Sequence, residues 1–296
     1  MANSKLPSPE PKARILKLTV AYDGTRFVGW QRQADGESIQ GLLEQALARF
    51  DGAPVTVHGA GRTDAGVHAL GQVASAEVTF PHDAASIHRG LNASLPPDVR
   101  VTAVEDAPAG FHARFSARSK TYRYVLDTSP VASPFNRSFA WHLPERLDVE
   151  AMRKAASALV GNHDFAAFQS TGSETSGTVR TITRSTLTTS QQDMQWGEPC
   201  VGRTLSGPPG EPDTGVPAAL ARWGGVARPT IVIAYEVSGN GFLRHMVRAI
   251  AGTLVEVGRG WREPGSMAAL LAGGNRAQAG PTAPAHGLFL VRVDYD

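Results

Sequence analysis

The stretch Gly61-Arg62-Thr63-Asp64-Ala65-Gly66-Val67-His68-Ala69-Leu70-Gly71-Gln72 decides the fold of this chain, because it holds a short loop between two strand-like runs. Glycines bracket the loop, and Asp64 lies two residues from Arg62. Asp-Ala-Gly alone is ordinary turn chemistry, since Asp bonds to nearby backbone amides and Gly adopts positive φ. The same loop can hold a carboxylate in the open. The stretch therefore admits two interpretations, a turn aspartate and a functional one.

The segments around this loop alternate between the two periodicities of regular structure. Residues 14–22 alternate with period two, which is typical of a strand. Ser38 is a suitable N-cap for a helix whose apolar residues recur at helical spacing up to Phe50. The resulting order is β-α-β-β-α-β. Its expected elements are strands over residues 14–22, 55–59, 67–78 and 99–105 and helices over 39–50 and 84–94.

The second half repeats the alternation with longer connections, which indicates two copies of one layer design. Asp148 is the expected cap of a helix that ends at Gly161. Residues 191–228 are rich in Gly and Pro and predict a mobile surface insertion. The expected elements are strands over residues 111–127, 180–189, 230–237 and 288–295 and helices over 148–160, 242–257 and 266–271.

Size and composition narrow the class of protein without deciding it. The chain has 296 residues, 42% of them hydrophobic, which suffices for one large or two moderate cores. A net charge of +2 is too small to indicate a nucleic-acid partner, so any RNA-binding surface must come from local clustering of basic residues. The single cysteine, Cys200, excludes a disulfide framework and a cysteine zinc site, and it fits a reducing cytoplasm. No run approaches the roughly 20 apolar residues of a membrane span. Residues 1–12 are expected to form a disordered tail without a signal core.

Motifs over nearly the whole chain extend the pattern around Asp64. They are Leu18-Thr19-Val20-Ala21-Tyr22-Asp23-Gly24-Thr25 with Phe27, Gly29, Trp30 and Gln31, Ala117-Arg118 with Tyr122-Arg123-Tyr124, His163-Asp164-Phe165, Gly241-Phe242-Leu243-Arg244-His245-Met246-Val247-Arg248, and Ala283-Pro284-Ala285-His286-Gly287-Leu288. In this order they resemble the tRNA pseudouridine synthases of the TruA type. The long insertion departs from the compact form of that family.

The resemblance implies an α/β enzyme of two ferredoxin-like, RRM-like subdomains whose antiparallel sheets join. We expect an N-terminal subdomain over residues 13–109, carrying the Asp64 loop, and a C-terminal one over 110–296. The resemblance further implies a cytoplasmic homodimer that acts on uridines 38 to 40 of the tRNA anticodon stem-loop, without cofactor or metal.

The expected reaction determines which groups the site must contain. Turning uridine into pseudouridine breaks the C1′–N1 bond and forms a C1′–C5 bond, so it needs an ionised carboxylate and a pocket for a flipped-out base. The resemblance makes Asp64 the catalyst, as nucleophile or base. Attack at C1′, attack at C6 and removal of a sugar proton all stay open. The resemblance assigns Arg62 to base displacement and RNA contact, and Arg248 to pairing with Asp64; the alternative for Arg248 is a solvated charge on the helix edge.

The run from His112 to Tyr124 carries four basic residues and no acid, interleaved with aromatics, which suits a strand that holds phosphates and stacks a base. Alternation puts Tyr122 and Tyr124 on one face, so both could instead be core aromatics. The resemblance makes Tyr122 the residue that stacks on uracil and Leu288 the opposite pocket wall; sequence alone would make Leu288 a core residue. The residues expected to bind RNA are Arg114, Arg118, Lys120, Arg123 and Arg244.

The nine histidines do not have metal-site spacing. Asp64 and His68 would supply two ligands at most, and His68 is expected to hold the aspartate loop through a ring hydrogen bond. The sequence leaves two other classes of protein as alternatives: a catalytically silent RNA-binding or RNA-chaperone module, which would not need Asp64, and a metal-dependent hydrolase. The Arg62-Thr63-Asp64 string together with Arg248 argues against the silent module.

Overall fold

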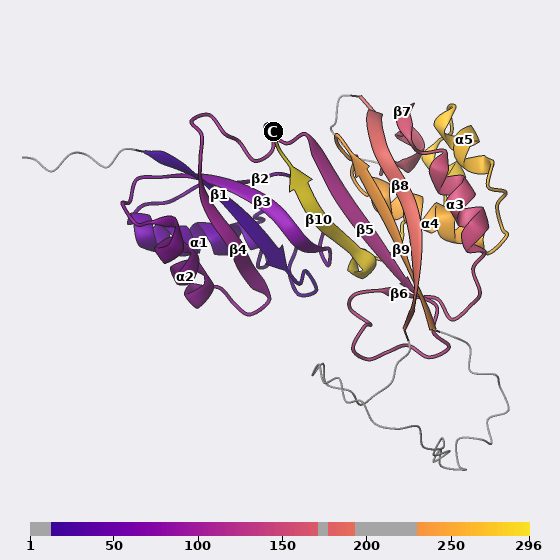
Figure 1. Cartoon of the computed structure of the whole chain (residues 1–296), viewed down its shortest axis with the longest axis horizontal. Coiled ribbons are helices and arrows are strands. Elements are labelled where there is room, and N and C mark those ends of the chain that lie inside the picture. The colour runs from indigo at the N-terminus through magenta and orange to yellow at the C-terminus, as the bar shows by residue number, and fades with distance from the viewer. Residues whose placement is uncertain (1–12, 171–176, 193–229) are drawn as a thin grey trace, which may run out of the picture.

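A computed structural model describes residues 13–170, 177–192 and 230–296 of the chain. The tail at residues 1–12 and most of the insertion expected at 191–228 lie outside the described residues. The described residues form a mixed α/β structure around one large sheet of ten strands, as expected (Figure 1).

The first βαββαβ unit follows the order expected from the sequence. The Ser38 side chain caps the first helix by accepting from the Gly41 amide, and Gly52 ends it in the left-handed conformation with φ 70°. Its strands pair in the order β4-β1-β3, and β2 lies on the other edge of β3. The elements are β1 Arg14–Tyr22, α1 Ile39–Asp51, β2 Val57–Gly59, β3 His68–Val78, α2 Ala84–Ser94 and β4 Val99–Ala107.

The second unit repeats this order in the sheet as β10-β5-β9-β8. Two short strands that the sequence did not indicate, β6 and β7, pair with β5 and β8. The elements are β5 Ser119–Asp127, β6 Trp141–His142, α3 Val149–Ser157, β7 Gly161–Asp164, η1 Ala166–Phe168, β8 Val179–Gln192, β9 Thr230–Gly239, α4 Met246–Gly258, α5 Ser266–Leu271, η2 Arg276–Gln278, η3 Ala285–Gly287 and β10 Leu288–Asp294.

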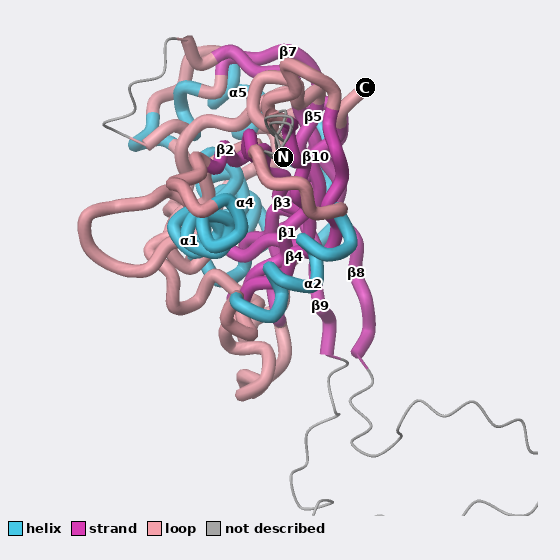
Figure 2. Tube along the Cα trace, turned by 90° about the vertical axis from the view of Figure 1, so that its left-hand side faces the viewer, coloured by secondary structure: helices cyan, strands magenta, loops and turns pink. Residues whose placement is uncertain are grey.

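The two units join where β10 pairs with β3. This pairing is parallel, whereas the pairs of neighbouring strands within each unit's run, β4-β1-β3 and β10-β5-β9-β8, are antiparallel. It matches Phe289 with His68, the first residue of β3. Seen from the side, α1 and α4 lie on the same face of the sheet (Figure 2). The first residues of β3 and β10 therefore meet in the middle of the molecule, and α4 of one unit lies on the same side as α1 of the other.

Three predicted boundaries were wrong. The strand expected over residues 111–127 begins only at Ser119, because the His112 ring accepts from the amides of Arg114 and Phe115 and closes a turn. The helix expected over 242–257 begins at Met246, after a left-handed residue. Asp148 caps its helix as expected, at 2.9 Å from the Ala151 amide.

That helix, expected to end at Gly161, ends at Ser157. The chain then continues in turns up to Gly161, whose φ of 126° starts β7 instead of closing the helix. A glycine that follows an apolar helix is ambiguous, because positive φ serves the start of a strand as well as the end of a helix.

Candidate active site

The loop that carries Asp64 is held by close backbone packing. The amide of Trp30 donates to the Thr63 carbonyl at 3.1 Å, and the amide of Val67 donates to the Asp64 carbonyl at 3.1 Å. Gly29 has φ 109°, and a methyl group there would meet the Thr63 carbonyl oxygen at 2.5 Å. Only glycine lets the two backbones come this close. The aspartate loop is therefore seated against the segment that follows β1.

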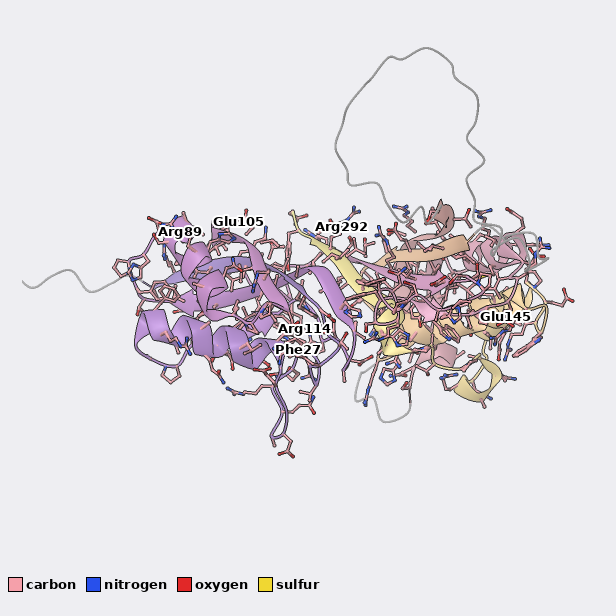
Figure 3. All side chains as sticks on the ribbon, turned by 90° about the horizontal axis from the view of Figure 1, so that it is seen from below. Phe27, Arg89, Glu105, Arg114, Glu145 and Arg292 are labelled. Carbon is pink, nitrogen blue, oxygen red and sulfur yellow. The ribbon has the colours of Figure 1, made fainter. Side chains whose placement is uncertain are left out.

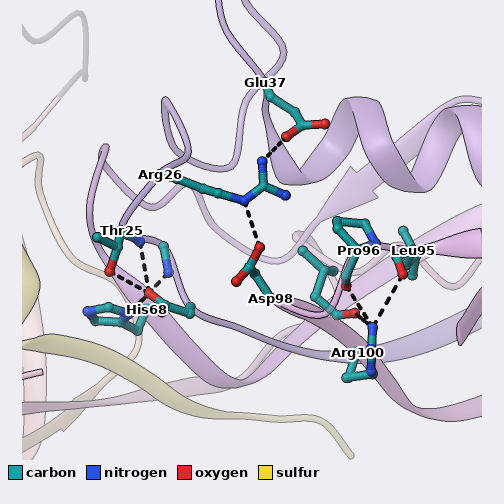
Figure 4. A network of polar contacts seen from close by, with 11 residues as sticks. Thr25, Arg26, Glu37, His68, Leu95, Pro96, Asp98 and Arg100 are labelled. Atoms are coloured by element: carbon teal, nitrogen blue, oxygen red, sulfur yellow. Dashed lines mark hydrogen bonds and ion pairs between the residues drawn. The ribbon is translucent and has the colours of Figure 1, made fainter. Parts of the chain in front are cut away.

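That segment is itself fixed by charged contacts. Arg26 bonds to Asp98 at 2.6 Å and also pairs with Glu37 (Figure 4). The Thr25 amide donates to the Asp23 carboxylate at 2.9 Å. These exposed contacts stabilise the fold little, but they hold the loop that supports Asp64.

His68 lies at the joint between the two units, as the sequence predicted for a structural histidine. It is buried, with its ring stacked on Phe289 at a centroid distance of 4.8 Å. Nδ1 accepts from the Gly24 amide at 3.0 Å, so Nε2 carries the proton and donates to the Ser138 carbonyl at 2.8 Å. Burial lowers the pKa of His68, which keeps the ring neutral. The ring thus ties the Asp64 loop to the second unit.

Arg248 reaches Asp64 from the second unit. Its Nη1 lies 3.2 Å from Asp64 Oδ2, and its Nε donates to the Ala283 carbonyl at 2.7 Å. The Arg248 side chain is 16% exposed and that of Asp64 is 34% exposed. An ion pair between residues 184 positions apart holds the carboxylate at the junction of the units. The arginine does not project into solvent from the edge of α4.

His245 is a second side chain beside the Asp64 carboxylate, and the sequence reasoning did not assign it. Its Nε2 lies 3.4 Å from Asp64 Oδ2, and its Nδ1 lies 2.6 Å from Ser170 Oγ. His245 and Arg248 are three residues apart, the spacing that places side chains on one face of a helix. That spacing was the available signal.

Tyr122 and Leu288 are both buried, at 8% and 6% exposure. The Tyr122 ring packs edge-on against Phe242 at a centroid distance of 5.0 Å. Burial raises the pKa of Tyr122, and the nearby Tyr22 and Asp64 raise it further. Leu288 is the first residue of β10 and pairs with Tyr124, next to the pairing of Leu290 with Tyr122. Tyr122 is thus electrostatically coupled to Asp64, and Leu288 lies two positions away along the adjoining strand.

The five residues expected to bind RNA do not share one surface. Lys120 is two residues before Tyr122 on β5 and therefore faces the same way. Its Cε would meet a methyl group on Gly61 at 3.6 Å, so it lies over the Asp64 loop. Arg123 faces the opposite way, and its Nε bonds to Glu236 at 2.9 Å.

The remaining basic residues are exposed. Arg114 lies close enough to Lys120 to lower its pKa, although burial is the larger cause. Arg118 bonds to the carboxylate of Asp296 at 2.7 Å. Arg62 and Arg244 are both exposed. Arg62 lies on the Asp64 loop, and Arg244 lies before α4. Arg62 and Lys120 thus lie on and over the Asp64 loop, Arg114 lies near Lys120, and Arg244 precedes His245 in the chain.

The described residues contain no group of three or more His, Cys, Asp or Glu side chains placed to hold a metal ion. They also contain no helix long and apolar enough to cross a membrane.

A carboxylate paired with an arginine from the other unit thus lies beside a buried tyrosine at the junction of the two units. A family model described as tRNA pseudouridine synthase matches residues 18–116 and 155–296. The chain belongs to the tRNA pseudouridine synthase family, whose members isomerise uridine to pseudouridine in tRNA. The predicted family, fold class and isomerase activity are thereby confirmed.

Curated relatives called tRNA pseudouridine synthase A are similar over almost their full length. The one from Syntrophotalea carbinolica is 41% identical over 281 residues, covering 95% of this chain and 96% of the relative. The one from Nitratidesulfovibrio vulgaris is 44% identical, covering 95% and 99%. The one from Geotalea uraniireducens is 40% identical, covering 95% and 100%.

Proposed function

We propose that this chain converts uridines 38 to 40 of the tRNA anticodon stem-loop to pseudouridine, with Asp64 as the catalytic carboxylate. The observation that carries the proposal is the ion pair of 3.2 Å between Asp64 Oδ2 and Arg248 Nη1, because it holds a half-exposed carboxylate at the junction of the two units. The relatives named tRNA pseudouridine synthase A support tRNA as the substrate.

The reaction breaks the C1′–N1 bond, turns the base over and forms the C1′–C5 bond, and the hydrogen at C5 leaves as a proton. Asp64 acts on the sugar or the base as nucleophile or base and stabilises the charge that develops at C1′. The guanidinium of Arg248 balances the charge of the carboxylate. No redox step and no hydrolysis occurs, and the proposal requires no cofactor or metal.

The residues around Asp64 divide the remaining tasks. Tyr122 stacks on the uracil ring, Leu288 forms the opposite wall, and Arg62 displaces the base and contacts the RNA. Flipping the nucleotide out of its stack costs a few kcal/mol, which stacking on an aromatic ring offsets.

Binding of the anticodon arm comes from basic side chains that contact phosphates. Arg62, Arg114, Lys120 and Arg244 form this surface in the proposal, and they lie on the Asp64 loop, before and at the start of β5, and before α4. Arg118 and Arg123 contact RNA in the same proposal, for which each must exchange its acidic partner, Asp296 or Glu236, for phosphate. The active form is a homodimer in the cytoplasm, as in the family that the chain resembles.

Replacing Asp64 with Asn tests the assignment directly. The variant keeps the size of the side chain but removes the charge, so release of tritium from tRNA labelled at uridine C5 should fall to background. Binding of tRNA should change by less than about threefold, because phosphate contacts dominate it. Asp106→Asn, at an exposed aspartate paired with Arg14, is the matched control and should retain the parent rate. A folded Asp64→Asn protein that still releases tritium at the parent rate would refute the proposal.

A further inference from the structure

His245 adopts a backbone conformation that is unusual for its residue type. Its φ of 61° and ψ of 5° make it the one non-glycine residue with positive φ among the described residues. A side chain in this left-handed region strains the backbone, and such strain is found mainly at functional sites. It also stands at the N-cap of α4 without a side-chain hydrogen bond to the helix. Helix capping therefore does not explain the histidine.

The contacts of its ring do explain it. Nδ1 lies 2.6 Å from Ser170 Oγ, and Nε2 lies 3.4 Å from Asp64 Oδ2. A serine hydroxyl that donates to Nδ1 leaves the ring proton on Nε2, where it faces the carboxylate. The distance of 3.4 Å is longer than a well-formed hydrogen bond, and such contacts commonly shorten when substrate binds. The ring thus connects Ser170 to Asp64.

Both partners of the carboxylate act on the same oxygen. Arg248 Nη1 lies 3.2 Å from Asp64 Oδ2, the atom that His245 also approaches. Within the described part of the chain, no hydrogen bond reaches the other oxygen, Oδ1. Two donors on one oxygen fix the rotation of a carboxylate better than one and leave the second oxygen available for chemistry.

We propose that His245 is a positioning residue, which together with Arg248 holds Oδ2 of Asp64 so that Oδ1 is the oxygen that acts on the nucleotide. Ser170 fixes the tautomer of the ring in this arrangement. The inference rests on the proposed role of Asp64 as the catalyst, and it adds a second donor from the opposite unit to that site.

Burial favours a neutral His245 ring, and four charged groups face it. They are Arg244 before α4, Arg248 on α4, Arg276 on η2 and Asp64 on its loop. Burial lowers the pKa of His245, the three arginines lower it further, and Asp64 opposes them. A neutral donor orients the carboxylate without adding a second full positive charge. A protonated ring would bind Oδ2 more strongly and could no longer accept from Ser170.

Substitutions at residue 245 separate the ring from the backbone. His245→Gly relieves the strain at positive φ and removes the donor, so the fold should be kept while the single-turnover rate of tritium release falls about 10- to 100-fold. His245→Gln restores an amide donor near the position of Nε2 and should recover part of the rate. The dissociation constant for tRNA should change by less than about threefold in both variants. His88→Gln on α2 is the matched control and should behave as the parent protein.

The pH dependence gives a readout that a merely structural role would not change. The parent rate should fall as the pH drops below the ordinary histidine range near about 6.5, and this decline should be absent in His245→Gln. Ser170→Ala should weaken the preference for the productive tautomer and move the decline without abolishing turnover. Melting curves establish that each variant is folded.

The outcomes separate this inference from the proposed function. If Asp64→Asn is inactive and folded His245→Gly turns over at the parent rate, the positioning role is wrong and the catalyst stands. If Asp64→Asn is active, the catalyst itself is wrong. If His245→Gly does not fold, the rate and pH profile of His245→Gln decide: a parent rate with an unchanged decline would overturn the inference, and a lower rate without the decline would support it.

Discussion

The two βαββαβ units share one strand order but begin their second helices differently. In the first unit, Asp83 caps α2 in the usual way, with its side chain 2.6 Å from the Ser86 amide, and the helix buries Ile87 and Leu91. In the second unit, α4 begins at His245 without a side-chain cap, and eleven of its residues are buried. The first helix start serves stability, whereas the second directs side chains toward Asp64.

The groups of the candidate site also come from different units. The first unit provides the carboxylate from the connection between β2 and β3, and the second provides Arg248 and His245 from the start of α4. The corresponding β8–β9 connection of the second unit contains residues 193–229, outside the described part of the chain. The candidate site thus takes its carboxylate from one unit and the two side chains that contact it from the other.

The largest effect on stability should come from the glycine that seats the Asp64 loop. Gly29→Ala places a methyl group 2.5 Å from the Thr63 carbonyl oxygen at a φ of 109°. The strain and the forced shift of the loop should lower the free energy of unfolding by about 3 kcal/mol, and activity should fall with it. Denaturant titration and tritium release measure the two effects.

Gly52→Ala is the matched control at the end of α1. It has φ 70° with no atom within 4 Å of the added methyl group, so only the backbone cost of about 1 kcal/mol should appear, with activity unchanged. Equal effects of the two substitutions would show that close packing of the Asp64 loop against Gly29 contributes nothing.

The next effect concerns the arginine on α4. Arg248→Lys cannot bond to the Ala283 carbonyl and to Asp64 at once with fixed geometry, so the single-turnover rate should fall about 100-fold, which is about 2.7 kcal/mol. Arg89→Lys, on the outer face of α2 (Figure 3), should leave the rate unchanged. A parent rate in Arg248→Lys would mean that charge alone, without the fork of the guanidinium, is sufficient.

Sequence reasoning found the parts of this site that repeat a local pattern. The loop with Asp64 and the cap by Asp148 follow from residue chemistry over a few positions, whereas the expected ring hydrogen bonds of His68 are made with Gly24 and Ser138, 44 and 70 positions away. Strand alternation also predicts where Arg123 points, because neighbouring residues of a strand face opposite sides of the sheet and Arg123 follows Tyr122. Its pairing with Glu236 across β9 is a consequence of that alternation.

Two predicted boundaries failed for different reasons, one long-range and one local. The left-handed turn at His245, which delays α4 by four residues from its expected start at Phe242, is stabilised by contacts with Ser170 and Asp64 from distant segments. The turn after His112 arises because one ring captures two amides, a competition that helical or strand periodicity does not report. Functional and strained positions are where local rules fail.

A smaller effect should follow from the ordinary helix cap of the first unit. Asp83→Ala removes the acceptor for the Ser86 amide and should lower the melting temperature by about 2–4 °C without changing turnover. Asp83→Asn keeps a good capping residue and should melt close to the parent protein. Loss of activity in a folded Asp83→Ala protein would break the contrast between the two helix starts.

The smallest effect concerns the joint itself and appears as a pH dependence. Burial lowers the pKa of His68 in the folded state, so between about pH 7 and 6 the unfolded chain binds more protons and the stability falls as the pH falls. With an unfolded pKa near about 6.5, this residue can remove at most about 0.7 kcal/mol over that interval. Protonation would oppose the bond from the Gly24 amide to Nδ1, which links the first unit to the ring that reaches Ser138.

His68→Gln tests this dependence because its side chain keeps a donor for Ser138 but does not titrate. Its free energy of unfolding should therefore fall less between pH 7 and 6 than that of the parent protein. The ring carbon shifts of His68 in NMR spectra provide an independent readout if that variant is too unstable to compare. A ring that titrates near its ordinary value in the folded protein would mean that the neutral imidazole is not what joins the two units.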